Sequence, residues 1–257
     1  MYLLDKLKLV NSMAQKGTVE ALLSEYFLTH LDNIKDVTLK GITLESKISR
    51  TSIIRFCQKA GYDGFTVFVD ELSGEIEEQK KMLDNYQQLD VDFFKQMQVK
   101  FINEAENMAI PYYERLLDFV DESQKIFIYG NEKYVTCFNM LINKFFLLGK
   151  EVILNYNWDL KQQKEQFENL QANDLIIIIE PYMNYRTYHE TLMITLNPLQ
   201  SLYNTDAKII YIGQDVDDKI AVSIPLPYTY YEILYRNFFI YFDMLLITKL
   251  NARGNRS

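Results

Sequence analysis

Hydroxyl, cationic and amide side chains lie close together between residues 38 and 58, and such groups can bind a polyanion. Lysine and serine side chains suit phosphate oxygens, arginine and glutamine suit base edges, and an isoleucine can contact a thymine methyl group. We assign to this surface Thr38, Lys47, Ser49, Arg50, Thr51, Ser52, Ile54, Arg55 and Gln58. The chemistry that these residues support together is recognition of double-stranded DNA.

Two short helices joined by a tight turn must position these side chains. Thr38 can cap a helix over 39–45, because its hydroxyl can accept a free backbone N–H. After a short turn, Ser49 can cap a second helix over 50–60, which ends at Gly61. Apolar residues recur in the second helix at spacings of three and four, at Ile53, Phe56, Cys57 and Ala60. This spacing predicts one buried stripe and an opposite exposed face, as in a helix-turn-helix.

Short amphipathic helix pairs are common, and most of them do not bind DNA. The local charge favours the DNA-binding interpretation. Residues 35–60 hold six cations and two carboxylates, a balance of +4, whereas the whole chain has a net charge of −8. A basic segment in an acidic protein is typical of a phosphate-binding surface.

The residues around this helix pair follow a family pattern. They are Ser49, Ser52, Ile53, Arg55, Phe56, Gly61, Tyr62, Gly64 and Phe65. In this pattern the segment resembles the N-terminal domain of the RpiR (MurR/RpiR) family of bacterial transcriptional regulators. Thr43 and Lys47 depart from it, since the family has small residues near these positions, and Lys47 implies strain if the turn needs a positive φ. The resemblance implies a DNA-binding transcriptional regulator of carbohydrate-related genes.

Composition excludes several other classes of protein. The two cysteines, Cys57 and Cys137, lie in predicted amphipathic helices, so we interpret them as buried apolar residues in a reducing, cytoplasmic protein. We expect neither a signal peptide nor a membrane span, because the apolar run near 238–247 contains Asp243. The spacing of His30 and His189 suits no metal, and no nucleotide-binding fingerprint occurs, so we expect no cofactor.

The chain is predicted to divide into an all-helical domain over 1–75, a helical connector over 76–103 and an α/β domain over 104–257. Apolar strands are predicted at 125–130, 151–155, 174–180, 207–213 and 221–226. Helices are predicted at 104–120, 133–148 and 229–251. Buried strands that alternate with helices predict a parallel sheet in a three-layer αβα domain, with the last strand at an edge because of Pro225. The order resembles the SIS (sugar isomerase) domain of RpiR-family proteins.

Ligands in such folds bind beyond the carboxyl ends of the strands. The family has a glycine- and serine-containing turn after the first strand and a serine-, glycine- and threonine-containing turn after the third, and both hold a phosphate. The corresponding residues here, which we assign to ligand binding, are Gly130, Asn131, Lys133, Glu180, Tyr182, Asn184, Tyr185 and Arg186. Only the first glycine of the pattern is present, and a carboxylate at 180 repels phosphate. The site is either vestigial or adapted to a neutral or cationic ligand.

Three functions remain open at this point. The first is a DNA-binding regulator, a homodimer or tetramer, whose second domain dimerises and can sense a small-molecule effector. The second is an enzyme of the sugar-phosphate isomerase type, which the altered phosphate turns disfavour. The third is an interaction module without DNA binding, which the cations of the helix pair disfavour.

Overall fold

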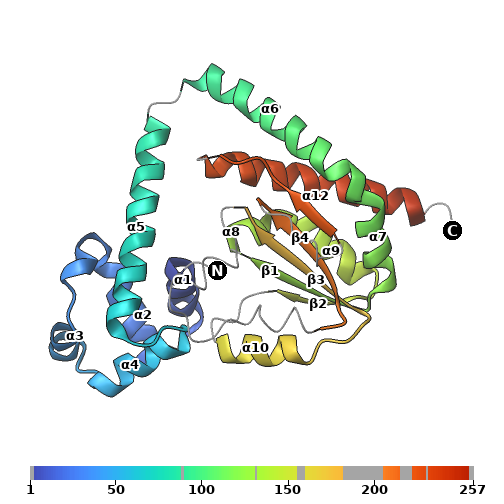
Figure 1. The fold of residues 1–257 in the computed structure, drawn as a ribbon. Coiled ribbons are helices and arrows are strands. Elements are labelled where there is room, and N and C mark those ends of the chain that lie inside the picture. The colour runs from blue at the N-terminus through green and yellow to red at the C-terminus, as the bar shows by residue number, and fades with distance from the viewer. Residues whose placement is uncertain are drawn as a thin grey trace. The chain divides into compact units, whose positions relative to one another are not determined.

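The structure is a computed structural model, and it describes residues 3–87, 90–130, 132–154, 160–181, 205–214, 222–229 and 231–254. The chain forms two compact units (Figure 1). As far as they are described, the first contains residues 3–81 and 160–169, and the second contains residues 82–154, 170–181 and 205–254. Their limit at 81–82 falls inside one continuous helix, so the domain boundaries 1–75, 76–103 and 104–257 stay predictions.

The first unit is all-helical. Its elements are α1 (Leu3–Met13), α2 (Val19–Thr29), the 3₁₀ helix η1 (Leu31–Asp36), α3 (Leu39–Ser46), α4 (Arg50–Lys59), the start of α5 (Phe65–Gln87) and α10 (Leu160–Glu168). Large apolar side chains from α1, α2, α4 and α5 form its core, with Leu7, Phe27, Ile53 and Phe68 almost fully buried. The rings of Phe27 and Phe68 lie 4.8 Å apart and join α2 to α5. This core fixes the helix pair α3–α4 on a rigid base.

The second unit is an α/β domain. Its helices are α6 (Val91–Ala109), η2 (Ile110–Tyr112), α7 (Tyr113–Glu122), α8 (Glu132–Val135), η3 (Thr136–Phe138), α9 (Asn139–Leu147) and α12 (Glu232–Gly254). Its strands are β1 (Lys125–Gly130), β2 (Glu151–Leu154), β3 (Asp174–Glu180), β4 (Lys208–Gly213) and β5 (Val222–Pro225). All strand pairs are parallel, in the order β2-β1-β3-β4-β5. The predicted edge position of the strand with Pro225 is confirmed.

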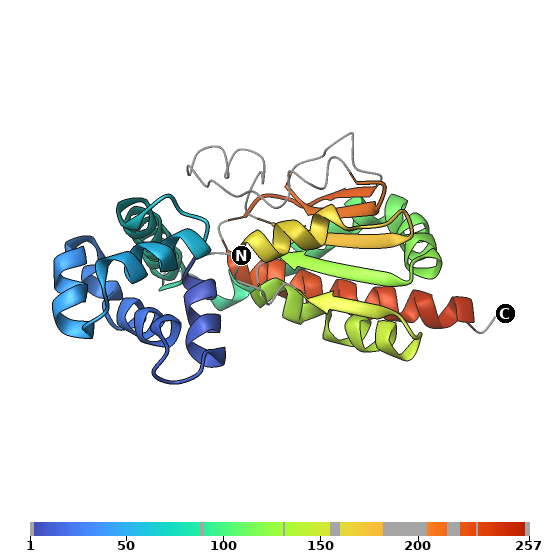
Figure 2. The same ribbon diagram turned by 90° about the horizontal axis from the view of Figure 1, so that it is seen from below.

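Both faces of the sheet are covered. On one face, Ile126, Ile177 and Ile210 belong to the core shared with α6, α7, α9 and α12, of which α12 is the red helix beside the strands in Figure 2. On the other face, Phe127, Ile176 and Tyr211 are buried as well. All seven residues of β3 are buried, as expected for a central strand of a three-layer domain. The predicted α/β class is confirmed.

Two predicted helices are interrupted. The helix expected over 104–120 breaks at η2, because Pro111 has no backbone N–H to donate to the preceding turn. The helix expected over 133–148 is divided into α8, η3 and α9. The buried Asp243 carboxylate of α12 accepts the N–H groups of Met140 (3.1 Å) and Leu141 (2.7 Å), and so caps a new helix start at α9.

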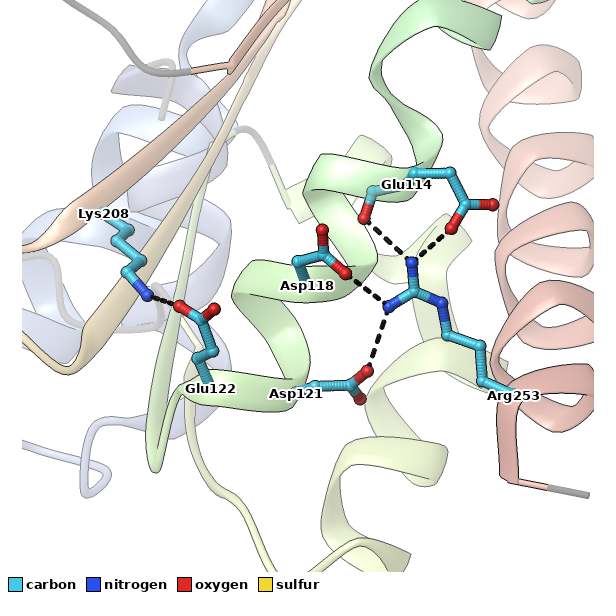
Figure 3. Close-up of polar contacts among 6 residues, drawn as sticks. All are labelled: Glu114, Asp118, Asp121, Glu122, Lys208 and Arg253. Atoms are coloured by element: carbon cyan, nitrogen blue, oxygen red, sulfur yellow. Dashed lines mark hydrogen bonds and ion pairs between the residues drawn. The ribbon is translucent and has the colours of Figure 1, made fainter. Parts of the chain in front are cut away.

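Ion pairs tie the end of α12 to α7 (Figure 3). The Arg253 guanidinium donates to carboxylate oxygens of Asp118 (2.7 Å) and Asp121 (3.1 Å) and contacts the Glu114 carboxylate. Lys208 at the start of β4 pairs with Glu122 at the end of α7. The Glu114 and Asp118 hydrogen bonds raise the pKa of Arg253, so the charge of this clamp is permanent. The network fixes the helix layer on one face of the sheet.

Candidate nucleic-acid interface

Two hydroxyl caps set the helix pair. The Thr38 Oγ1 accepts the Gly41 N–H at 3.1 Å and begins α3. The Ser49 Oγ accepts the Ser52 N–H at 3.2 Å and begins α4. Both caps were predicted, and they leave the two hydroxyl-bearing residues at the helix starts, where free N–H groups suit phosphate.

The turn between the helices is tight. Lys47 has φ 58° and ψ 19°, a left-handed conformation that most side chains avoid. It is the one non-glycine residue with positive φ in the described part of the chain. The Ser46 Oγ accepts the Ile48 N–H at 3.2 Å, and the Ile48 side chain is buried under the turn. The strain predicted for a lysine here is therefore present, while its ammonium group stays exposed.

The recognition helix α4 has one buried face and one exposed face. Ile53, Phe56 and Cys57 are buried in the core, as the spacing predicted. Burial raises the pKa of the Cys57 thiol to about 12, so this cysteine is an inert apolar residue. Cys137 of the second unit is half-buried against its core. The opposite face of α4 exposes Arg50, Thr51, Arg55 and Gln58, with Ser52 and Ile54 half-buried at its margins.

The cations around this face differ in their partners. Lys59 pairs with Glu20 at 2.9 Å, and Lys35 pairs with Glu77, so both are neutralised by carboxylates from outside residues 35–60. Among the described residues, the structure records no ion pair for the remaining four, which are Lys40, Lys47, Arg50 and Arg55. These four cations keep their charge available to a polyanion. Lys40 was counted in the basic segment but missed as a site residue, although its place in the first turn of α3 was a usable signal.

The N-terminal residues match a known domain family. Residues 4–79 match the model of the helix-turn-helix domain, rpiR family. These residues form a helix-turn-helix domain of the rpiR family, and the chain is a DNA-binding transcriptional regulator. No curated protein matches this regulator in sequence.

Solved structures resemble the regulator in fold. The Vibrio vulnificus NanR protein complexed with ManNAc-6P has 13% sequence identity and a TM-score of 0.51, and the alignment covers 99% of this chain and 93% of that one. The sugar isomerase domain of an RpiR transcription factor from Sphaerobacter thermophilus has 13% identity, with coverage of 66% and 93% and a TM-score of 0.47. A Methanococcus jannaschii protein with an inferred 3-hexulose-6-phosphate isomerase function has 16% identity, with coverage of 62% and 92% and a TM-score of 0.41.

The strand ends of the second unit show why the regulator retains one glycine of the phosphate pattern. Gly130 ends β1 with φ 158°, and a Cβ atom there would collide with the Ile179 carbonyl oxygen of β3. Close approach of two strands thus requires this glycine without any ligand. The Lys133 ammonium lies 2.9 Å from the Glu232 carboxylate of α12, so its charge is neutralised, and Glu180 is buried at the end of β3. The other predicted ligand residues, Asn131, Tyr182, Asn184, Tyr185 and Arg186, lie outside the described residues.

The His30 side chain has a structural role. The His30 ring stacks on Tyr26 at 4.0 Å, and its Nδ1 lies 2.7 Å from the Tyr26 carbonyl oxygen. Its Nε2 lies 3.7 Å from the Glu45 carboxylate of α3. These contacts join α2 to α3, whereas His189 lies outside the described residues. The described residues contain no cluster that could hold a metal ion, and none of their helices is long and apolar enough to span a membrane.

Proposed function

We propose that the regulator binds double-stranded DNA by placing α4 in the major groove. Lys47, Ser49 and Ser52 contact phosphates, and Thr38 with Lys40 extends this contact along α3. Arg50, Thr51, Arg55 and Gln58 face the base edges, and Ile54 contacts a thymine methyl group. The observation that carries this proposal is the exposed face of α4, whose arginines have no carboxylate partner among the described residues.

We infer further that the regulator acts as a homodimer, because one helix-turn-helix contacts too few base pairs for useful specificity. The second unit exposes large apolar side chains that suit this contact. Met140 and Leu147 of α9 and Ile240 and Met244 of α12 are between 48% and 83% exposed. The two helices are in contact, because the Asp243 carboxylate of α12 accepts the Met140 N–H of α9. Large exposed apolar side chains on packed helices favour a second copy of this chain as partner.

We also propose that the second unit does not bind a sugar phosphate through the family's phosphate turns. Lys133 is paired with Glu232, and Gly130 is explained by strand packing. An effector, where one exists, is then neutral or cationic. The same observations argue against a sugar-phosphate isomerase, so we infer that the chain is not an enzyme. We further propose that the regulator controls carbohydrate-related genes, because the NanR protein that it resembles in fold is complexed with ManNAc-6P. We place the regulator in the cytoplasm, where bacterial DNA lies.

The test begins with genomic fragments that the full chain enriches, followed by fluorescence anisotropy on the best fragment. Arg50→Ala should lower the affinity at least tenfold and reduce the salt slope by about one. Lys59→Ala is the matched control, because this neighbouring cation is already paired with Glu20 and should change affinity less than threefold. Equal affinities of wild type and Arg50→Ala would remove α4 from the interface.

A further inference from the structure

A buried lysine contacts the end of the recognition helix from the side opposite to the proposed DNA surface. Lys6 of α1 is only 6% exposed, and its Nζ donates to the Ala60 carbonyl oxygen at 3.5 Å, the long limit of a hydrogen bond. Ala60 is the C-cap residue of α4, and Gly61 follows with φ 99°. A cation at this end of a helix is favourable, because the last carbonyl groups have no partner within the helix.

Two carboxyl side chains of α5 are buried in the same unit. Glu75 is 6% exposed and accepts the N–H groups of Leu3 (2.6 Å) and Leu4 (2.8 Å), which begin α1. Glu71, one turn earlier, is 8% exposed. Burial lowers the pKa of Lys6, and the charges of Glu75 and Glu71 oppose this shift. These contacts connect three helices, because Glu75 of α5 holds the first turn of α1 and Lys6 of α1 reaches the last carbonyl group of α4.

Buried ionisable groups of this kind contribute little net stability to a fold. Taking three ionisable groups out of water costs several kcal/mol per charge, and apolar residues of similar volume are often at least as stable. What buried polar contacts can supply is a defined geometry, because apolar contacts tolerate sliding whereas a hydrogen bond fixes direction. The element whose direction matters most in this unit is α4, since its exposed face must fit the groove.

We propose that Lys6 is a positioning residue for DNA recognition, which holds the C-terminal end of α4 on α1 through the Ala60 carbonyl oxygen, while Glu75 holds the start of α1 on α5. Lys6 itself lies in the interior and contacts no DNA. This inference rests on the proposed function of α4.

The variant Lys6→Met keeps the volume and removes the charge. At a temperature at least 20 °C below its melting point, we expect it to bind the enriched DNA fragment at least tenfold more weakly. Amide hydrogen exchange at residues 59–61 should become faster. Lys6→Arg, which retains the charge and a donor, should bind within threefold of the wild type.

The double variant Lys6→Met with Glu75→Gln separates positioning from stability. It removes both ionisable groups from the interior, so its melting point should return toward that of the wild type while the DNA affinity stays low. Affinity within twofold of wild type in either folded neutral variant overturns the positioning role. Loss of folding in both neutral variants assigns Lys6 to stability and overturns the role as well. Arg50→Ala tests the proposed function independently. If Arg50→Ala lowers the DNA affinity as expected and Lys6→Met does not, only the inference about Lys6 is rejected.

Discussion

Lys47 in the helix-turn-helix and Lys133 at the strand ends are the same residue type in two regions where the family binds phosphate. Lys47 is exposed and unpaired within the described residues, and it occupies a strained backbone conformation. Lys133 is about three-quarters buried and paired with Glu232. A lysine near a phosphate motif therefore indicates phosphate binding only if no nearby carboxylate neutralises its positive charge. We therefore propose that the first region keeps an anion-binding surface and that the second has lost it.

The largest test of this contrast is the double variant Arg50→Ala with Arg55→Ala. Each lost base or phosphate contact weakens binding by about 1–3 kcal/mol, so the pair should lower DNA affinity by at least about 30-fold. Lys133→Ala in the second unit should leave the affinity within twofold. Anisotropy titrations at several salt concentrations measure both. A large loss with Lys133→Ala, or none with the arginine pair, would reverse the assignment of the two regions.

Each region also has one buried carboxylate that caps a helix. Glu75 accepts two N–H groups of α1, and Asp243 accepts two of α9. Replacing either by alanine leaves buried donors unpaired, so each variant should lower the free energy of unfolding of its own unit by about 1–3 kcal/mol. Calorimetry of the full chain measures this loss. Equal effects of both variants on a single transition would show that the two units unfold together.

The pKa of Glu75 predicts how the stability of the first unit depends on pH. Burial raises the pKa of Glu75 to about 8 from its ordinary 4.5, against the effect of its two backbone hydrogen bonds and with help from Glu71 and Asp5. Because the folded pKa is the higher one, the protonated form contributes stability that is present below pH 4.5 and is lost as the pH rises toward 8. Burial lowers the pKa of Lys6 to about 8, so the titration of Lys6 affects stability mainly above that range. Glu75→Gln should therefore flatten the melting point of the first unit between pH 5 and 8.

The sequence predicted the helix-turn-helix nearly residue by residue, because caps, turn and apolar spacing are local signals. Ser49 and Gly61 fall at the predicted ends of α4, and the five strands lie within one residue of their predicted limits. Long-range partners were not predictable. The Asp243 cap on α9 spans about 100 residues, and the Lys6–Glu75 cluster joins the two ends of the first unit. Neither contact produces a periodic pattern in the sequence. The role of Gly130 could be assigned only from the position of the neighbouring strand β3.

The strained turn provides a smaller test. Lys47→Gly relieves a left-handed conformation, so it should stabilise the first unit by about 1 kcal/mol, partly offset by the greater freedom of glycine in the unfolded chain. It also removes one phosphate contact, so the DNA affinity should fall and the salt slope should decrease by about one. Lys47→Asn, which tolerates the same backbone conformation, is the control for charge loss. A stabilised variant with unchanged affinity would place the Lys47 ammonium outside the interface.

The smallest expected effect concerns the second region. Glu232→Gln frees the Lys133 ammonium, but Gly130 itself carries no hydroxyl group that could help it hold a phosphate. We therefore expect inorganic phosphate or a hexose phosphate at 10 mM to stabilise this variant by only a few tenths of a kcal/mol, as for a ligand near its dissociation constant, and to leave the wild type unchanged. Thermal shift assays of both proteins measure this. Strong stabilisation of the wild type by micromolar sugar phosphate would contradict the contrast, because other residues would then have to supply the positive charge that Lys133 cannot.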